Sequence, residues 1–267
     1  MRLSEFTPAE TLLLTKGSNV LLKDLLKYTF MDLLLRKVLL LTRKKYQPDA
    51  RSKGVTMKYI SAGTAFNSYQ ALSHEQVFTS PFLQGKRNIQ FRFMIKMAVE
   101  QAAKFSDYDP LILESSSINK FVKKNIFHRV FGGYTWTSEG KDLGELLKKE
   151  LQLLDKDLPL WMKQDQKKAL EVFTSIKGNV FLLKNVDFQL LRNFDKEVIE
   201  LQRTLSESND WGGYGMISLD SSWISDSHHS SSWDTSFDSS WDSVSGCSSD
   251  SGCSSGCSGC GGCGGGD

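Results

Sequence analysis

Residues 7–41, TPAETLLLTKGSNVLLKDLLKYTFMDLLLRKVLLL, carry the clearest fold signal in this chain. Thr7, Pro8 and Glu10 predict a helix start, because a threonine cap, an early proline and a glutamate three residues after the cap satisfy or remove the free N–H groups there. Gly17 is expected to end this helix, and Ser18 or Asn19 to cap the next one. In the second helix, leucines and aromatic residues cover so much of the circumference that we expect it to be largely buried.

A β-hairpin is expected directly after these two helices. Alternating apolar residues predict a strand in GVTMKYI, residues 54–60, and less clearly in VLLLTRKKY, residues 38–46. The turn-rich segment QPDARSKG, residues 47–54, would connect them. Two helices followed by a hairpin resemble a winged-helix unit, although such a unit usually has three helices before its wing.

The remainder of the body is predicted to be mainly helical. Apolar residues at helical spacing favour helices in residues 87–105, 118–131, 144–154, 164–176 and 186–205, with Pro159 and Gly178 as breaks. In the first of these, Ile89, Phe93, Met97 and Ala98 are expected to form the buried stripe. A turn flanked by strand residues is expected at residues 131–136.

We therefore expect a mainly α, α-rich α+β protein with one or two winged-helix-like units that carry short β-hairpins. Residues 1–66 would form a winged-helix-like helix–helix–hairpin unit, residues 67–204 a helical domain, and residues 205–267 a tail. Whether the helical domain is a second copy of the first unit stays open. The possibility of a second copy rests on a similarity between KGSNVLLKD, residues 16–24, and KGNVFLLKN, residues 177–185.

The tail differs sharply from the body in charge and composition. Nine acidic and no basic side chains give residues 204–267 a formal charge of −9, which leaves +11 on residues 1–203 and +2 on the whole chain. Ser and Gly make up 33 of these 64 residues. So little apolar material does not offset the entropy of ordering a chain, and we expect the tail to be disordered.

Few residues of the body suit catalysis or a cofactor. It has no cysteine, and its two histidines are His74 and His128, for which structural roles are expected. Glycine-rich phosphate loops and paired histidines at helical spacing are missing, which favours a protein that is not an enzyme. Charged residues interrupt the most apolar stretch and no signal peptide is visible, so we expect a cytoplasmic protein without a transmembrane segment.

Basic residues gather in the predicted hairpin and its loop, namely Arg43, Lys44, Lys45, Arg51 and Lys53. They could neutralise the phosphates of a nucleic acid or contact an acidic partner. Their simpler interpretation is a solubilising edge hairpin. The long second helix offers no exposed face rich in Arg, Asn or Gln for base edges, so a protein partner is favoured over a nucleic acid.

Aromatic residues of the tail stand among serines and acids, at Trp223, Trp233, Phe237 and Trp241. Such spacing is typical of a recognition segment whose rings enter pockets on a partner. The partner would be an unidentified protein or the basic body of this same chain, in an intramolecular clasp. A tail without any binding role is the equal alternative.

All five cysteines of the chain lie in the tail, and four of them, Cys253, Cys257, Cys260 and Cys263, have spacings that could bring thiolates to one zinc ion. Zinc modules normally separate two cysteine pairs by a structured excursion, which is missing here. We expect no cofactor, and keep zinc binding, thiol redox chemistry and lipid attachment as alternatives.

The 7–41 opening, a second helical segment and the ending CSSGCSGCGGCGGGD, residues 253–267, together resemble a set of uncharacterised bacterial proteins. Those proteins have small winged-helix-like helical domains and Gly- and Cys-rich ends. Many of them have membrane spans, whereas this sequence shows none. The resemblance implies no activity. We expect an interaction or regulatory protein with a basic body and an acidic aromatic tail, and keep nucleic-acid binding and metal or thiol handling as alternative functions.

Overall fold

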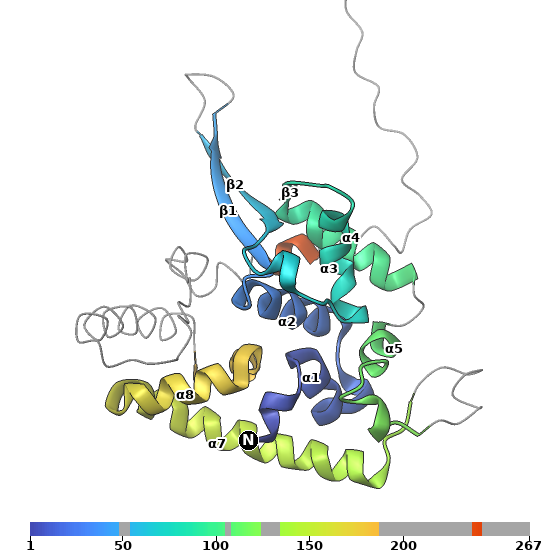
Figure 1. The fold of residues 1–267 in the computed structure, drawn as a ribbon, viewed down its shortest axis with the longest axis vertical. Helices are drawn as coiled ribbons and strands as arrows, with labels where there is room; N and C mark the ends of the chain where they lie inside the picture. The colour runs from blue at the N-terminus through green and yellow to red at the C-terminus, as the bar shows by residue number, and fades with distance from the viewer. Residues whose placement is uncertain (48–53, 105–107, 124–133, 187–236, 242–267) are drawn as a thin grey trace, which may run out of the picture.

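The structure is a computed structural model that describes residues 1–47, 54–104, 108–123, 134–186 and 237–241. Within these residues the fold is mostly helical, with one small antiparallel sheet (Figure 1). The predicted α-rich class is confirmed at this level. The winged-helix assignment and the proposed second copy stay predictions.

The N-terminal helices α1 (Pro8–Lys16) and α2 (Leu22–Leu35) lie close to their predicted positions. The predicted capping box is present, since Thr7 Oγ1 accepts a hydrogen bond from the Glu10 N–H at 3.4 Å and the Glu10 carboxylate accepts one from the Thr7 N–H at 2.7 Å. The predicted cap of α2 is wrong. Residues Gly17–Asn19 form a 3₁₀ turn instead, and Leu21 is the N-cap residue.

Helix α2 is the central element of the core, as its leucine content predicts. Its Phe30 ring lies 5.2 Å from the ring of Phe78 on α3 (Gln76–Leu83) and 5.7 Å from the ring of Phe91 at the start of α4 (Phe91–Lys104), measured between centroids. Aromatic pairs at this separation add to the free energy of burial. Helix α2 therefore joins the N-terminal helices to the following segment in one core.

The sheet consists of β1 (Leu39–Tyr46), β2 (Val55–Ala62) and the short β3 (Ile89–Gln90), in that spatial order. Strands β1 and β2 pair antiparallel from Leu39 opposite Ala62 to Tyr46 opposite Val55, as the predicted hairpin requires. Their far end projects away from the helices (Figure 1), and only the base of the hairpin belongs to the core, where Leu41 and Ile60 are buried.

The predicted stripe of the following helix is confirmed for Ala98 and wrong for Phe93. Ile89 belongs to β3, helix α4 begins at Phe91, and Phe93 is 56% exposed. The core-facing side chains of α4 are Phe91, Met94, Ile95, Ala98 and Ala102. Met97 is partly buried against the core, so the observed face overlaps the predicted stripe and extends to Met94, Ile95 and Ala102.

Helix α5 (Tyr108–Leu113) follows, and the helix predicted over residues 118–131 is wrong where the structure describes it. Residues Asn119–Phe121 form a 3₁₀ turn, and Val122 pairs with Trp136 in an isolated antiparallel β-bridge. This bridge agrees with the strand character expected near residue 136. His128 lies outside the described residues.

Helices α7 (Ser138–Gln164) and α8 (Gln166–Ile176) pack against each other, and α7 also packs against α1 (Figure 1). Pro159 was expected to end a helix but lies inside α7. Because proline has no N–H, the Asp155 carbonyl four residues earlier lacks its usual helical donor. The Asn185 Nδ2 donates to that carbonyl at 3.2 Å, so a distant side chain replaces the missing donor.

The 3₁₀ turn of residues Lys177–Leu182 closes the described body and returns to α2 and the N-terminus. Gly178 lies directly against the Asp32 carboxylate, where a Cβ atom would overlap its oxygen. Of the helices that the structure describes, none combines the length and the apolar composition that crossing a bilayer requires.

Candidate interaction site

Segment 237–241 of the tail forms a single helical turn that lies on α2 (Figure 1, orange-red). The Phe237 side chain is 0% exposed and belongs to the same apolar cluster as the core of the body. Trp241, one turn later, is partly buried against that cluster. Two of the four predicted tail anchors are thus in contact with the body of the same chain.

An ion pair accompanies the buried ring. Asp238 Oδ1 lies 2.9 Å from the Nζ of Lys23, in the first turn of α2. Both side chains are partly exposed, 26% for Lys23 and 42% for Asp238, so this pair contributes roughly 0.2–1 kcal/mol. Burial of a phenylalanine ring contributes about 1.5–3 kcal/mol. Phe237 therefore contributes more binding free energy than the ion pair, which orients the segment.

The remaining serines distinguish an inner from an outer side of this turn. Ser240 is buried beside Phe237, whereas Ser239 is exposed. A helical turn this short is not stable by itself in water. The order of segment 237–241 therefore depends on its contacts with the body, and this part of the tail departs from the expected disorder.

The contact reveals a spacing that the sequence interpretation missed. An aromatic residue followed directly by aspartate recurs every four residues, as Trp233-Asp234, Phe237-Asp238 and Trp241-Asp242. Lys23 was also missed, because the long second helix was considered only as a candidate for reading base edges. Lys23 and Lys27 are themselves four residues apart, and this match in spacing was the signal available in the sequence.

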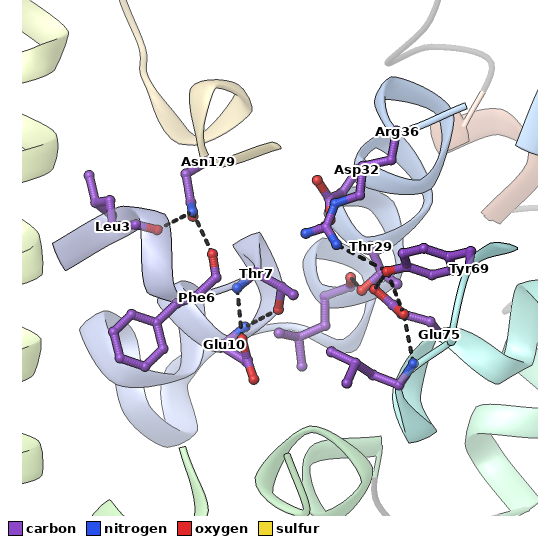
Figure 2. A network of polar contacts seen from close by, with 12 residues as sticks. Leu3, Phe6, Thr7, Glu10, Thr29, Asp32, Arg36, Tyr69, Glu75 and Asn179 are labelled. Atoms are coloured by element: carbon purple, nitrogen blue, oxygen red, sulfur yellow. Dashed lines mark hydrogen bonds and ion pairs between the residues drawn. The ribbon is translucent and has the colours of Figure 1, made fainter. Parts of the chain in front are cut away.

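A second cluster of polar side chains lies inside the body at the C-terminal end of α2 (Figure 2). The Arg36 Nη2 lies 2.7 Å from Asp32 Oδ2, and its Nη1 donates to the Tyr69 hydroxyl at 3.0 Å. The Tyr69 hydroxyl donates to the Glu75 carboxylate at 2.8 Å, which also accepts from the Leu72 N–H at 2.8 Å. One guanidinium thus lies among two carboxyl groups and a phenol.

Burial dominates the electrostatics of this cluster. It raises the pKa of Asp32, against the opposing effect of Arg36, and raises the pKa of Glu75 to about 7. Burial, followed by the positive charge of Arg36, lowers the pKa of the adjacent His74 to about 3. Asp32, His74 and Glu75 are each 1% exposed. This buried cluster connects the end of α2 with residues 69–75 through its hydrogen bonds and ion pair. A substrate could reach these groups only if the core opened.

The described basic residues predicted for the hairpin lie on strand β1, and their side chains alternate between the two faces of the sheet. Arg43, Lys44 and Lys45 lie on β1, where successive side chains point to opposite faces. Arg43 pairs in register with Lys58 of β2, and the pKa of Lys58 is lowered by burial and by the charge of Arg43. The Lys44 Nζ lies 5.5 Å from the centre of the Tyr59 ring. Arg51 and Lys53 lie outside the described residues.

Several further predicted site residues also lie outside the described residues, namely Trp223, Trp233, Cys253, Cys257, Cys260 and Cys263. Among the described residues, no group of three or more His, Cys, Asp or Glu side chains is arranged to hold a metal ion. Zinc binding by the tail stays a prediction.

Comparison of the chain with protein-family models, with curated proteins and with solved structures gave no match.

Proposed function

We propose that this protein is a non-enzymatic interaction protein of the cytoplasm, in which the basic body binds an acidic, aromatic peptide segment and its own tail occupies that site. The burial of Phe237 beside the Lys23–Asp238 ion pair is the observation that carries the proposal. A buried aromatic anchor with a partly exposed charge pair at its edge is typical of a binding hot spot.

The charge distribution of the chain supports the same function. The body carries a formal charge of +11 and the tail −9. Opposite net charges attract the two parts before contact. Since the tail belongs to the same chain as its site, its effective concentration there is high.

Hydrogen exchange of the full-length protein tests this function. Phe237→Ala should raise exchange in segment 237–241 and in the first turns of α2, because the turn loses its anchor. Phe93→Ala, which removes an exposed phenylalanine from α4, is the matched control and should leave both regions unchanged. Exchange in α7 and α8 reports whether the body remains folded. Equal protection of α2 in the two variants would contradict the proposal.

Nucleic-acid binding by Arg43, Lys44, Lys45, Arg51 and Lys53 is the second candidate function. The pairing of Arg43 with Lys58 across the hairpin supports it, since like charges directly opposite each other favour a nearby anion. Binding to a DNA or RNA duplex should then weaken steeply as salt is added, and Arg43→Ala should reduce the salt dependence by about one phosphate contact. No binding at low salt excludes this candidate.

A further inference from the structure

We infer that the site on α2 that holds Phe237 and Asp238 also binds segments of other proteins in which an aromatic residue is followed directly by aspartate, and that the tail competes with them. This inference rests on the proposed function. It adds the chemistry of the partner: a short Ser- and Asp-rich segment that forms one helical turn on binding.

Recognition within the tail is local. The fully buried ring, Phe237, and the carboxylate that forms the ion pair, Asp238, are neighbours in the sequence, and Trp241 packs against the core one turn later. Ser240 completes the inner side of the turn and is small. A site that reads two adjacent side chains does not require the rest of this chain, so a segment with the same pair on another protein meets the same requirements.

The tail itself contains the pair in three copies. Trp233-Asp234, Phe237-Asp238 and Trp241-Asp242 share a spacing of four residues, which is close to one helical turn. On a segment that becomes helical upon binding, each copy would place a ring and a carboxylate in the same relative positions. Repetition of the pair favours a site that selects aromatic–Asp pairs over one that selects a single unique sequence.

The covalent link decides which segment occupies the site. A segment on the same chain can have an effective concentration on the order of millimolar. A partner with a single aromatic–Asp pair therefore binds weakly while the tail is intact, and removal of the tail anchors should expose the site. Affinity for a partner is thus set by the competition between the two segments.

The test measures binding of a fluorescent peptide with the sequence of residues 231–243 to three full-length proteins. These are the native chain, a variant with Trp233→Ala, Phe237→Ala and Trp241→Ala, and that variant with Lys23→Glu added. The triple variant should bind the peptide at least tenfold more tightly than the native chain, because its own anchors no longer compete. Adding Lys23→Glu should weaken binding roughly tenfold, since the ion pair becomes a repulsion.

Two controls make the outcome specific. Lys163→Glu in the triple variant changes the same charge on a distant, exposed part of α7 and should leave affinity unchanged. A peptide with its three aspartates changed to lysine should bind the Lys23→Glu protein better than the triple variant, which reverses the preference. Equal binding of this peptide to both proteins would overturn the assigned role of Lys23.

Hydrogen exchange of α2 in the same proteins separates the two proposals. If the triple variant exposes α2 but does not bind the peptide, the inference about partners is wrong and the proposed docking of the tail stands. If α2 is equally protected in the native chain and the triple variant, both are wrong. Increased exchange together with peptide binding supports both.

Discussion

Two neighbouring buried side chains, His74 and Glu75, respond to pH in opposite directions. The pKa of Glu75 is about 7 in the fold against an ordinary value of 4.5, so its contribution to stability is full below pH 4.5 and is lost as the pH rises to 7. The pKa of His74 is about 3 against 6.5, so its contribution is full above pH 6.5 and is lost as the pH falls towards 3.

Between pH 4.5 and 6.5 these two contributions cancel, and variants should separate them. Glu75→Gln leaves the histidine alone, so the free energy of unfolding should rise with pH in this window by up to about 1.4 kcal/mol per unit. His74→Gln should give the opposite slope. Urea denaturation at several pH values measures both. Parallel profiles for the native protein and Glu75→Gln would show that Glu75 does not keep its proton.

Asn179 joins two ends of the described body through one amide group. Its Nδ2 donates to the carbonyl oxygens of Leu3 at 2.9 Å and Phe6 at 2.8 Å, and the side chain is fully buried (Figure 2). The N-terminal residues thus depend on a turn that lies more than 170 positions later.

Removal of this amide should be costly. Asn179→Ala leaves two buried carbonyl groups without their donor, and we expect a loss of about 2–4 kcal/mol in the free energy of unfolding. Asn179→Asp keeps the size but loses both donated hydrogen bonds, so it should also destabilise. Gln152→Ala, on the exposed side of α7, is the control and should change stability by less than about 0.5 kcal/mol. Chemical denaturation measures all three.

Among the helices, α7 shows how an element depends on a partner outside itself. Pro159 frees the Asp155 carbonyl, and Asn185 satisfies that carbonyl while its backbone N–H and Nδ2 also donate to the Asp155 carboxylate at 2.7 Å and 3.1 Å. The helix continues through the proline because these groups compensate for the missing donor.

A double-mutant cycle tests this compensation. Asn185→Ala should cost about 1 kcal/mol in the native background, because the two exposed hydrogen bonds of the Asn185 side chain are lost while its backbone N–H keeps its acceptor. In the Pro159→Ala background the new N–H of residue 159 can donate to the Asp155 carbonyl, so the same change should cost about 0.5 kcal/mol less. The free energy of unfolding from urea denaturation gives the coupling. Equal costs in both backgrounds would mean that Asn185 does not replace the helical donor.

Across the whole molecule, two parts of opposite charge meet at an apolar contact. Salt screens the charges but does not weaken burial of the Phe237 ring, so the two contributions can be told apart. The partly exposed Lys23–Asp238 pair is the described ionic contact between tail and body.

Raising sodium chloride from 50 mM to 1 M should therefore increase hydrogen exchange in segment 237–241 only modestly. The change should correspond to about 1 kcal/mol or less and remain smaller than the effect of Phe237→Ala. Asp238→Asn should weaken docking at low salt and reduce its salt dependence. A salt effect larger than that of Phe237→Ala would show that charge, and not the ring, holds the segment.

Local patterns were sufficient for several elements. The Thr7–Glu10 capping box, the buried α2, the β1–β2 hairpin and the position of α8 follow from interactions between residues a few positions apart, and such interactions can be inferred from spacing alone. The mainly helical class and the division between a basic body and an acidic tail were predictable for the same reason.

Contacts between distant residues account for what spacing could not predict. Helix α7 continues past Pro159 because Asn185 supplies a donor, and Ile89 and Gln90 pair with β2 as strand β3 instead of extending α4. The composition of the tail predicts disorder, yet segment 237–241 is ordered by Lys23, which lies more than 200 positions earlier, and by burial of Phe237 in the core of the body. These features are stabilised by contacts with surfaces that exist only after the chain has folded. They therefore cannot be inferred from any short stretch of the sequence.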